Sequence, residues 1–171
     1  MQELITSHFN KNNVLSTAIY SPCKKYRYSL TRASRNSEAS VLFILLNPST
    51  ATEITNDPTV LRCQVRADML GYQSFRVCNL FAFRTKMPKI MKSYPDPVGP
   101  QNDIIIQESI LWANQVICAW GNHGNYLNRN KDILEMIAMS RVKAYHLGLT
   151  EANQPRHPLY LSYSQKLVRW I

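Results

Sequence analysis

The sequence has no long apolar run, and this excludes one class of protein. None of its 171 residues belongs to an apolar stretch of the ~18 residues that a membrane-spanning helix needs. The first residues, MQELITSHFNKNN, also lack the basic start and apolar stretch of a secretion signal. We therefore expect a cytoplasmic protein without a membrane partner.

Metal-binding patterns are also missing. The four cysteines, Cys23, Cys63, Cys78 and Cys118, form no C-x-x-C pair, and three of them lie in apolar or helix-like segments. The four histidines show no i,i+3 or i,i+4 spacing, and no acidic cluster accompanies them. We expect buried thiols, no metal site and no cofactor.

Acidic residues are few. Eleven Asp and Glu stand against twenty Lys and Arg, which gives a formal net charge of +9. A positively charged protein attracts polyanions, so DNA is the first candidate partner. Charge alone does not select this function, because many basic proteins bind no nucleic acid.

Apolar runs alternate with helix-like segments over most of the chain. Strands are predicted at 41–46, 75–83, 115–121 and 142–148, and helices at 58–70, 102–114 and 128–139. This alternation is typical of right-handed βαβ units. We predict a single domain over 1–171, with a three-layer α/β/α fold, a mostly parallel four-stranded central sheet and an N-terminal β-hairpin at 13–32. A monomer is favoured, although the oligomeric state is open.

Polar residues follow the predicted strand ends. Asn47 breaks the run VLFILL and precedes Pro48, Asn79 breaks the second run, and Gly121 ends the third. His157 lies in the loop after the fourth strand. Because the carboxyl ends of parallel strands meet at one edge, where α/β proteins bind ligands, we expect these residues to form one site.

Six motifs in order resemble an uncharacterised family of short bacterial and phage proteins that is defined only as a domain of unknown function. The motifs are LLNPSTA, NDPTVLRC, VCNLFAFRT, DPVGPQND, AWGNHG and LGLTEANQPRHPLY. The resemblance extends from about residue 20 to the C-terminus and implies no activity.

The order of the strand-ending motifs is also similar to that of the uracil-DNA glycosylase superfamily, which implies a glycosylase-like fold and hydrolysis without a cofactor. By this resemblance, Asn47 positions the attacking water and His157 stabilises the departing base as an anion. Asn79 hydrogen-bonds the flipped base, and either Phe81 or Trp120 stacks on it. The motifs do not fix which aromatic ring does so.

Two turns depart from the superfamily pattern. Ser49 and Thr50 follow Asn47-Pro48 where glycine is usual, which implies a narrower approach for DNA. Leu159 and Tyr160 follow His157-Pro158 in place of a serine-rich turn, and these two side chains are candidates for the wedge that extrudes a base. The base therefore need not be uracil. Because the cysteines lack the close N-terminal pair of the branches with an iron–sulfur cluster, we expect no cluster.

Several residues have a structural and a functional interpretation. Asp57 is either the cap of the helix that starts at Pro58 or a group that activates water. His123, between Gly121 and Gly124, is either a turn residue or part of a phosphate contact. Arg129 either contacts phosphate or is a solvated surface cation. Arg156 precedes His157 and favours an anion-facing role for this loop, so it is a candidate nucleic-acid contact.

We expect a DNA glycosylase-like enzyme that hydrolyses the N-glycosidic bond of a damaged or modified base. The alternatives are an enzyme of free nucleotides or nucleosides and a non-catalytic nucleic-acid-binding module. DNA activity predicts positive charge around the strand-end edge, whereas a nucleotide enzyme predicts a closed pocket with dispersed charge.

Overall fold

The computed structural model describes residues 3–171. Its strands are β1 (Ile5–Lys11), β2 (Val14–Tyr20), β3 (Arg27–Ser34), β4 (Ser40–Leu45), β5 (Ser74–Asn79), β6 (Gln115–Cys118), β7 (Ala144–His146) and β8 (Val168–Arg169). Its α-helices are α1 (Pro58–Met69), α2 (Pro88–Ser93), α3 (Asn102–Trp112) and α4 (Arg129–Ser140). Two 3₁₀ segments, η1 (Asn122–Asn128) and η2 (Pro158–Tyr160), complete the regular structure.

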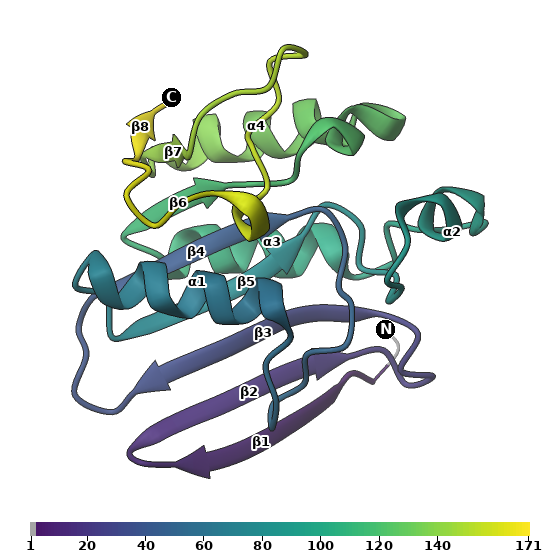
Figure 1. Cartoon of the computed structure of the whole chain (residues 1–171). Helices are drawn as coiled ribbons and strands as arrows, with labels where there is room; N and C mark the ends of the chain where they lie inside the picture. Colours follow the sequence, from purple (N-terminus) through teal and green to yellow (C-terminus); the bar gives the residue numbers. More distant parts are fainter. Residues whose placement is uncertain (1–2) are drawn as a thin grey trace.

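All strands of the described chain join one mixed sheet (Figure 1). Across residues 3–171 the eight strands follow the order β1-β2-β3-β5-β4-β6-β7-β8. The neighbours β5, β4, β6 and β7 are parallel. The strands β1, β2 and β3 extend the sheet in antiparallel fashion on the β5 side, and β8 pairs antiparallel with β7.

The predicted fold class is therefore wrong. The sheet is not a mostly parallel four-stranded one with a separate hairpin, and the expected glycosylase-like architecture fails with it. The edges of β5 and β7 carry backbone groups that need partners, and antiparallel strands supply them. On the β5 side, Leu30 of β3 lies opposite Val77, so the hairpin is part of the main sheet.

Two hydrophobic cores cover the two faces of the sheet. Every residue of β4 is buried, and its side chains alternate between the faces. Val41, Phe43 and Leu45 pack with α1, whereas Leu42 and Ile44 pack with α3 and α4. Figure 1 shows α1 crossing one face and α3 and α4 behind the other. A strand buried on both faces explains the uninterrupted apolar run.

The parallel direction of β4, β5, β6 and β7 brings their carboxyl ends to one edge of the sheet. Four connections leave this edge: 46–57 into α1, 80–87 into α2, 119–121 into η1, and 147–157 into η2. These loops carry most of the polar residues that the sequence marked as candidates.

Candidate functional site at the carboxyl edge of the sheet

A cavity of about 580 Å³ lies among these loops. Its walls come from the segment after β4, the start of α1, the segment before α2, the turn after β6 and the last loop. The lining residues are Leu46, Asn47, Ser49, Thr50, Asp57, Pro58, Thr59, Thr85, Lys86, Pro88, Trp120, Gly121, Asn122, His123, His157, Leu159 and Tyr160. The volume is in the range of small-molecule sites. Residues far apart in the sequence thus share one concave surface.

Asn47 joins two of the walls. Its amide nitrogen donates to the carbonyl oxygens of Thr85 at 2.7 Å and Pro48 at 3.2 Å. Two acceptors on one side fix the orientation of the carboxamide. Within residues 3–171 no donor reaches Oδ1 of Asn47, so this oxygen is available to accept a hydrogen bond from water.

Asp57 caps α1 and also lines the cavity. Its Oδ1 accepts from the backbone N–H of Val60 at 2.9 Å, and its Oδ2 accepts from that of Ala51 at 3.2 Å. Pro58 follows at the first helical position, where a missing N–H costs nothing. The cap interpretation is confirmed. Each carboxylate oxygen has lone-pair capacity beyond its one N–H, so a role toward a water stays a prediction.

His157 is half-buried against the cavity. Its Nδ1 accepts from the backbone N–H of Leu159 at 3.3 Å. Burial lowers the pKa of His157, and the negative charge of Asp57 opposes this shift to a smaller extent. The imidazole is therefore neutral at pH 7, with its proton on Nε2. A neutral imidazole still has one N–H, and this group can donate a hydrogen bond to an anion.

The turn after β6 holds the His157 loop in place. Gly121 has φ +72°, a conformation that favours glycine, and its N–H donates to the carbonyl of Pro155 at 2.8 Å. The N–H of Gly124 donates to the carbonyl of Gly121 at 3.1 Å. A phosphate contact through the two glycines would need free N–H groups, but both N–H groups are engaged within the chain. His123 lines the cavity and is exposed; burial and then the charge of Lys92 lower its pKa.

Trp120 forms part of the cavity wall, although it is only 1% exposed. Its indole N–H donates to Oε1 of Gln154 at 3.0 Å. A Cβ added to Gly124 would collide with the indole ring, so glycine is required there for close packing. These contacts make Trp120 a rigid wall.

The rim of the cavity contains two hydroxyl side chains and two larger, apolar or aromatic side chains. Ser49 and Thr50 come from the segment after β4, and Leu159 and Tyr160 come from η2. Tyr160 is 88% exposed, which is unusual for a ring of this size. Its position suits contact with a partner outside the cavity.

Arg156 lies in a neighbouring hollow of about 520 Å³, which it shares with Gly121, His157 and Tyr160. Its Nε donates to the carbonyl of Leu149 at 3.1 Å, and the residue is exposed. The cavity wall formed by His157 and Tyr160 is therefore also a wall of the hollow that contains Arg156.

Besides Arg156, three other predicted site residues do not line the cavity. Asn79 is 1% exposed, and within the described chain its Nδ2 and Oδ1 have no hydrogen-bond partner. Phe81 is fully buried, with its ring centroid 5.7 Å from that of Tyr126. Arg129 is 4% exposed, donates to the carbonyl of Leu80 and pairs with two carboxylates. The structure places these side chains in the interior.

Sequence reasoning missed several lining residues. Thr85, whose carbonyl holds Asn47, also donates its N–H to the carbonyl of Pro48 at 2.9 Å. Lys86 brings a positive charge to the cavity wall. Thr85 ends the motif VCNLFAFRT and Lys86 follows it, but neither residue type carried a signal of its own.

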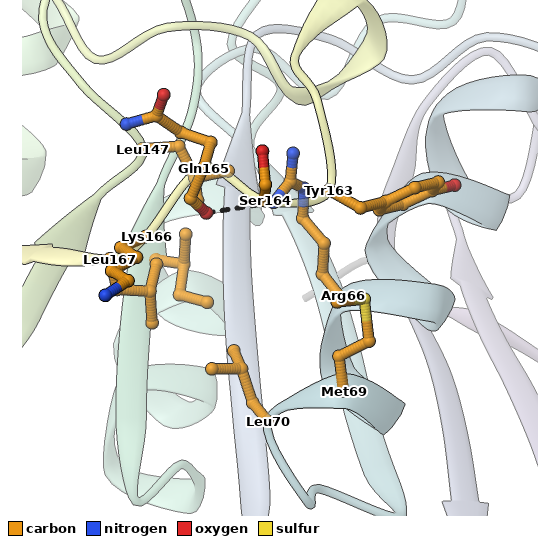
Figure 2. A pocket seen from close by; sticks show the side chains of 10 residues that line it. Arg66, Met69, Leu70, Leu147, Tyr163, Ser164, Gln165, Lys166 and Leu167 are labelled. Atoms are coloured by element: carbon orange, nitrogen blue, oxygen red, sulfur yellow. Dashed lines mark hydrogen bonds between the residues drawn. The ribbon is translucent and has the colours of Figure 1, made fainter.

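A second cavity of about 280 Å³ lies between the end of α1 and the segment before β8 (Figure 2). Figure 2 shows Arg66 beside Tyr163 and Ser164, with Leu70 and Leu167 lower in the same space. The Arg66 guanidinium donates to the carbonyl of Ser162 at 2.9 Å, which ties the last segment to α1. None of the predicted site residues lines this cavity.

In residues 3–171 no three His, Cys, Asp or Glu side chains group in a way that suits a metal ion. The four cysteines are free; Cys63, Cys78 and Cys118 are buried and Cys23 is exposed. No helix of the described chain has the length and apolarity needed to cross a bilayer.

These features define an α/β protein with a mixed sheet and a polar cavity at the carboxyl ends of its parallel strands. The chain belongs to a family described as protein of unknown function (DUF1643), whose match covers residues 27–159. This confirms the resemblance to a domain of unknown function. No curated protein and no solved structure matches the chain, and the comparisons provide no link to the uracil-DNA glycosylases.

Proposed function

We propose that the cavity hydrolyses the N-glycosidic bond of a damaged or modified base in DNA. One observation carries the proposal: Asn47, Asp57 and His157 come from three separate segments and line the same cavity. The order of the strand-ending motifs, which is similar to that of the uracil-DNA glycosylases, gives the chemistry. The proposal does not depend on the four-stranded architecture that the structure excludes.

The reaction needs a positioned water and a stabilised leaving group. The water oxygen forms a bond to C1′ of the sugar, the C1′–N bond breaks, and its electron pair leaves with the base. The water proton passes to the base or to solvent. A donor aimed at the base stabilises the transition state more than the ground state, because negative charge develops there.

The side chains of the cavity can supply these functions. Nε2 of neutral His157 donates to the developing anion of the base, since Nδ1 is occupied by the N–H of Leu159. Oδ1 of Asn47 accepts from the attacking water, because the amide nitrogen is held by two carbonyl oxygens. Asp57, fixed by two backbone N–H groups, is the nearby anion that favours positive charge on the sugar.

The wall residues favour DNA over a free nucleotide. Lys86, Asn122, His123 and Tyr160 line the cavity and are exposed, so the site opens to solvent and carries positive charge at its rim. A base that is extruded from a duplex needs such an opening and a side chain that takes its place in the stack. Tyr160 is the candidate for this side chain, with Leu159 beside it.

Base release tests the proposal. The protein is incubated with duplex and single-stranded DNA that contains uracil, a mismatch or a modified pyrimidine. Free bases are measured by mass spectrometry, and abasic sites by alkaline cleavage. We expect release of at least one base by the wild-type protein and its loss in His157→Ala.

A matched control is His8→Ala, because His8 is an exposed histidine of β1 that bonds only to Thr17. This variant should release base at the wild-type rate. Tight DNA binding without release would replace the proposal with a binding module. If the protein neither releases a base nor binds DNA, an enzyme of free nucleotides becomes the favoured alternative.

A further inference from the structure

Three lysines gather at the opening of the cavity, and the chemistry proposed for Asn47, Asp57 and His157 uses none of them. Lys86 precedes α2, and Lys89 and Lys92 are one turn apart on it, at the i,i+3 spacing that places side chains on one side. Together with His123 they line a hollow of about 430 Å³. We call Lys86, Lys89 and Lys92 the lysine shelf.

The lysine shelf is continuous with the cavity. Lys86, Pro88 and His123 line both the hollow and the cavity. The phenol O–H of Tyr126 in η1 donates to the carbonyl of Lys92 at 2.9 Å, and this bond joins α2 to the segment that carries His123. Figure 1 shows α2 standing apart from the helices that cover the sheet. The shelf therefore borders the opening of the cavity and is held there.

The shelf carries uncompensated charge. Among residues 3–171 both ion pairs belong to Arg129, so no carboxylate neutralises Lys86, Lys89 or Lys92. No acidic residue lines the hollow. Like charges at this spacing repel one another, and a polyanion would relieve the repulsion. The positive charge of Lys92 acts on His123 across the hollow, where it contributes to the lowered pKa.

The apolar surface between the lysines narrows the choice of polyanion. Met87 is 54% exposed and Ile90 is 48% exposed, and Met87 and Pro88 line the hollow with the lysines. A DNA strand presents phosphates at regular spacing with sugar carbons between them. An isolated phosphate would match the positive charge of the lysines but not the apolar surface between them.

We propose that the lysine shelf binds the sugar–phosphate backbone of a DNA strand whose target base enters the adjoining cavity. The entry of the base rests on the function proposed above, whereas binding of the strand stands independently of it. The shelf then decides on which side of the cavity the strand approaches.

Salt-dependent binding tests this proposal. Fluorescence anisotropy of a labelled oligonucleotide, single-stranded and duplex, is measured over a series of salt concentrations. The shelf variant is Lys86→Gln, Lys89→Gln and Lys92→Gln combined. The control variant combines Lys11→Gln, Lys143→Gln and Lys166→Gln. These three lysines are exposed and line neither the cavity nor the hollow beside the shelf. Both variants lose the same charge, and thermal unfolding checks that both are folded.

The expected result is a weaker affinity for the shelf variant alone. Its slope of log K against log salt should flatten by about 2 to 3, as expected when three phosphate contacts are removed. The control slope should stay close to that of the wild type. Equal losses in both variants, or no loss in either, would overturn the proposal.

Two further measurements separate this proposal from the catalytic one. If the shelf variant binds DNA and releases base like the wild type, the proposed role of the lysine shelf is wrong, whereas the proposed glycosylase activity stands. If the wild-type protein binds DNA through the shelf and releases no base, the strand-binding role stands, whereas the glycosylase activity is wrong. Equal displacement by a mononucleotide and by an oligonucleotide, at equal phosphate concentration, would also overturn a strand-binding shelf.

Discussion

The ends of β4 and β5 both carry an asparagine after an apolar run, yet the two side chains have opposite surroundings. Asn47 lies two residues beyond Leu45, the last residue of β4, and reaches the cavity. Asn79 is the last residue of β5 itself and pairs in register with Leu45. The offset of two residues corresponds to roughly 7 Å along a strand. Exposure to the site thus depends on register more than on residue type.

The difference also separates two kinds of polar contact. At the end of β4, hydrogen bonds join surface loops and leave the oxygen of Asn47 available. Behind β5, Asn102 donates to the carbonyls of Asn79 and Leu80, and Arg129 donates to that of Leu80. The first arrangement suits chemistry and the second supports the fold, so substitutions in the two regions should change different measured quantities.

The largest effect is expected at His157. His157→Ala removes the donor to the departing base and should lower the rate of base release by about 100- to 1,000-fold, the usual cost of losing such a donor. His157→Gln keeps an N–H donor and should lose less. Single-turnover release measures both variants, and an alanine variant with the wild-type rate would remove His157 from the chemistry.

Arg129→Gln tests the buried region. It breaks charged hydrogen bonds to Asp103 and Asp132, and the free energy of unfolding should fall by about 1.5–3 kcal/mol. Because both carboxylates are about half exposed, the lower part of this range is expected. Urea unfolding measures the loss. DNA binding by the folded variant should match that of the wild type, and a selective loss of binding would return Arg129 to the interface.

Asn47→Ala and Asn79→Ala compare the two strand ends directly. Asn47→Ala removes the acceptor for the attacking water, and base release should slow by at least about tenfold. Asn79→Ala should change release less, because its side chain is enclosed and does not line the cavity. The rates of base release by the two variants are compared at saturating DNA. The reverse order of losses would show that Asn79 reaches the base after a rearrangement.

The smallest effect is expected from pH. The pKa of His157 is lowered in the folded protein, so below the ordinary value near 6.5 the unfolded chain binds a proton first. The stability from neutral His157 is present above about pH 6.5 and is lost as the pH falls toward the lowered value, at less than about 1.4 kcal/mol per pH unit. Urea unfolding between pH 7.5 and 5 should show this slope.

His157→Gln should remove this part of the slope. His123 and His146 also have lowered pKa values and should keep the remainder. An unchanged slope in His157→Gln would mean that His157 does not titrate differently in the two states.

The sequence predicted the positions of the parallel strands, and the meeting of their carboxyl ends at one edge, better than the extent of the sheet. The run at 41–46 became Ser40–Leu45, and the helix at 58–70 became Pro58–Met69. These elements have strong apolar periodicity or a clear cap, and their own residues specify them. Asp57 followed by proline is such a signal.

The rest depended on partners that the sequence does not show. Strand β1 contains only two apolar residues, Ile5 and Phe9, and β8 has only Val168 and Arg169 in register with β7. Both are held by neighbouring strands. The burial of Asn79 was equally hidden, because the sequence does not show that this residue still belongs to β5 and pairs in register with Leu45.

Asn47 and His157 are proposed to act on one substrate in one cavity. Single-turnover base release by the wild type, Asn47→Ala, His157→Ala and the double variant tests this proposal most directly. If the two residues act together, the double variant should lose little more than His157→Ala alone. If the loss of rate in the double variant equals the product of the two single losses, the residues act independently. Release by the double variant at the wild-type rate would contradict the proposed site.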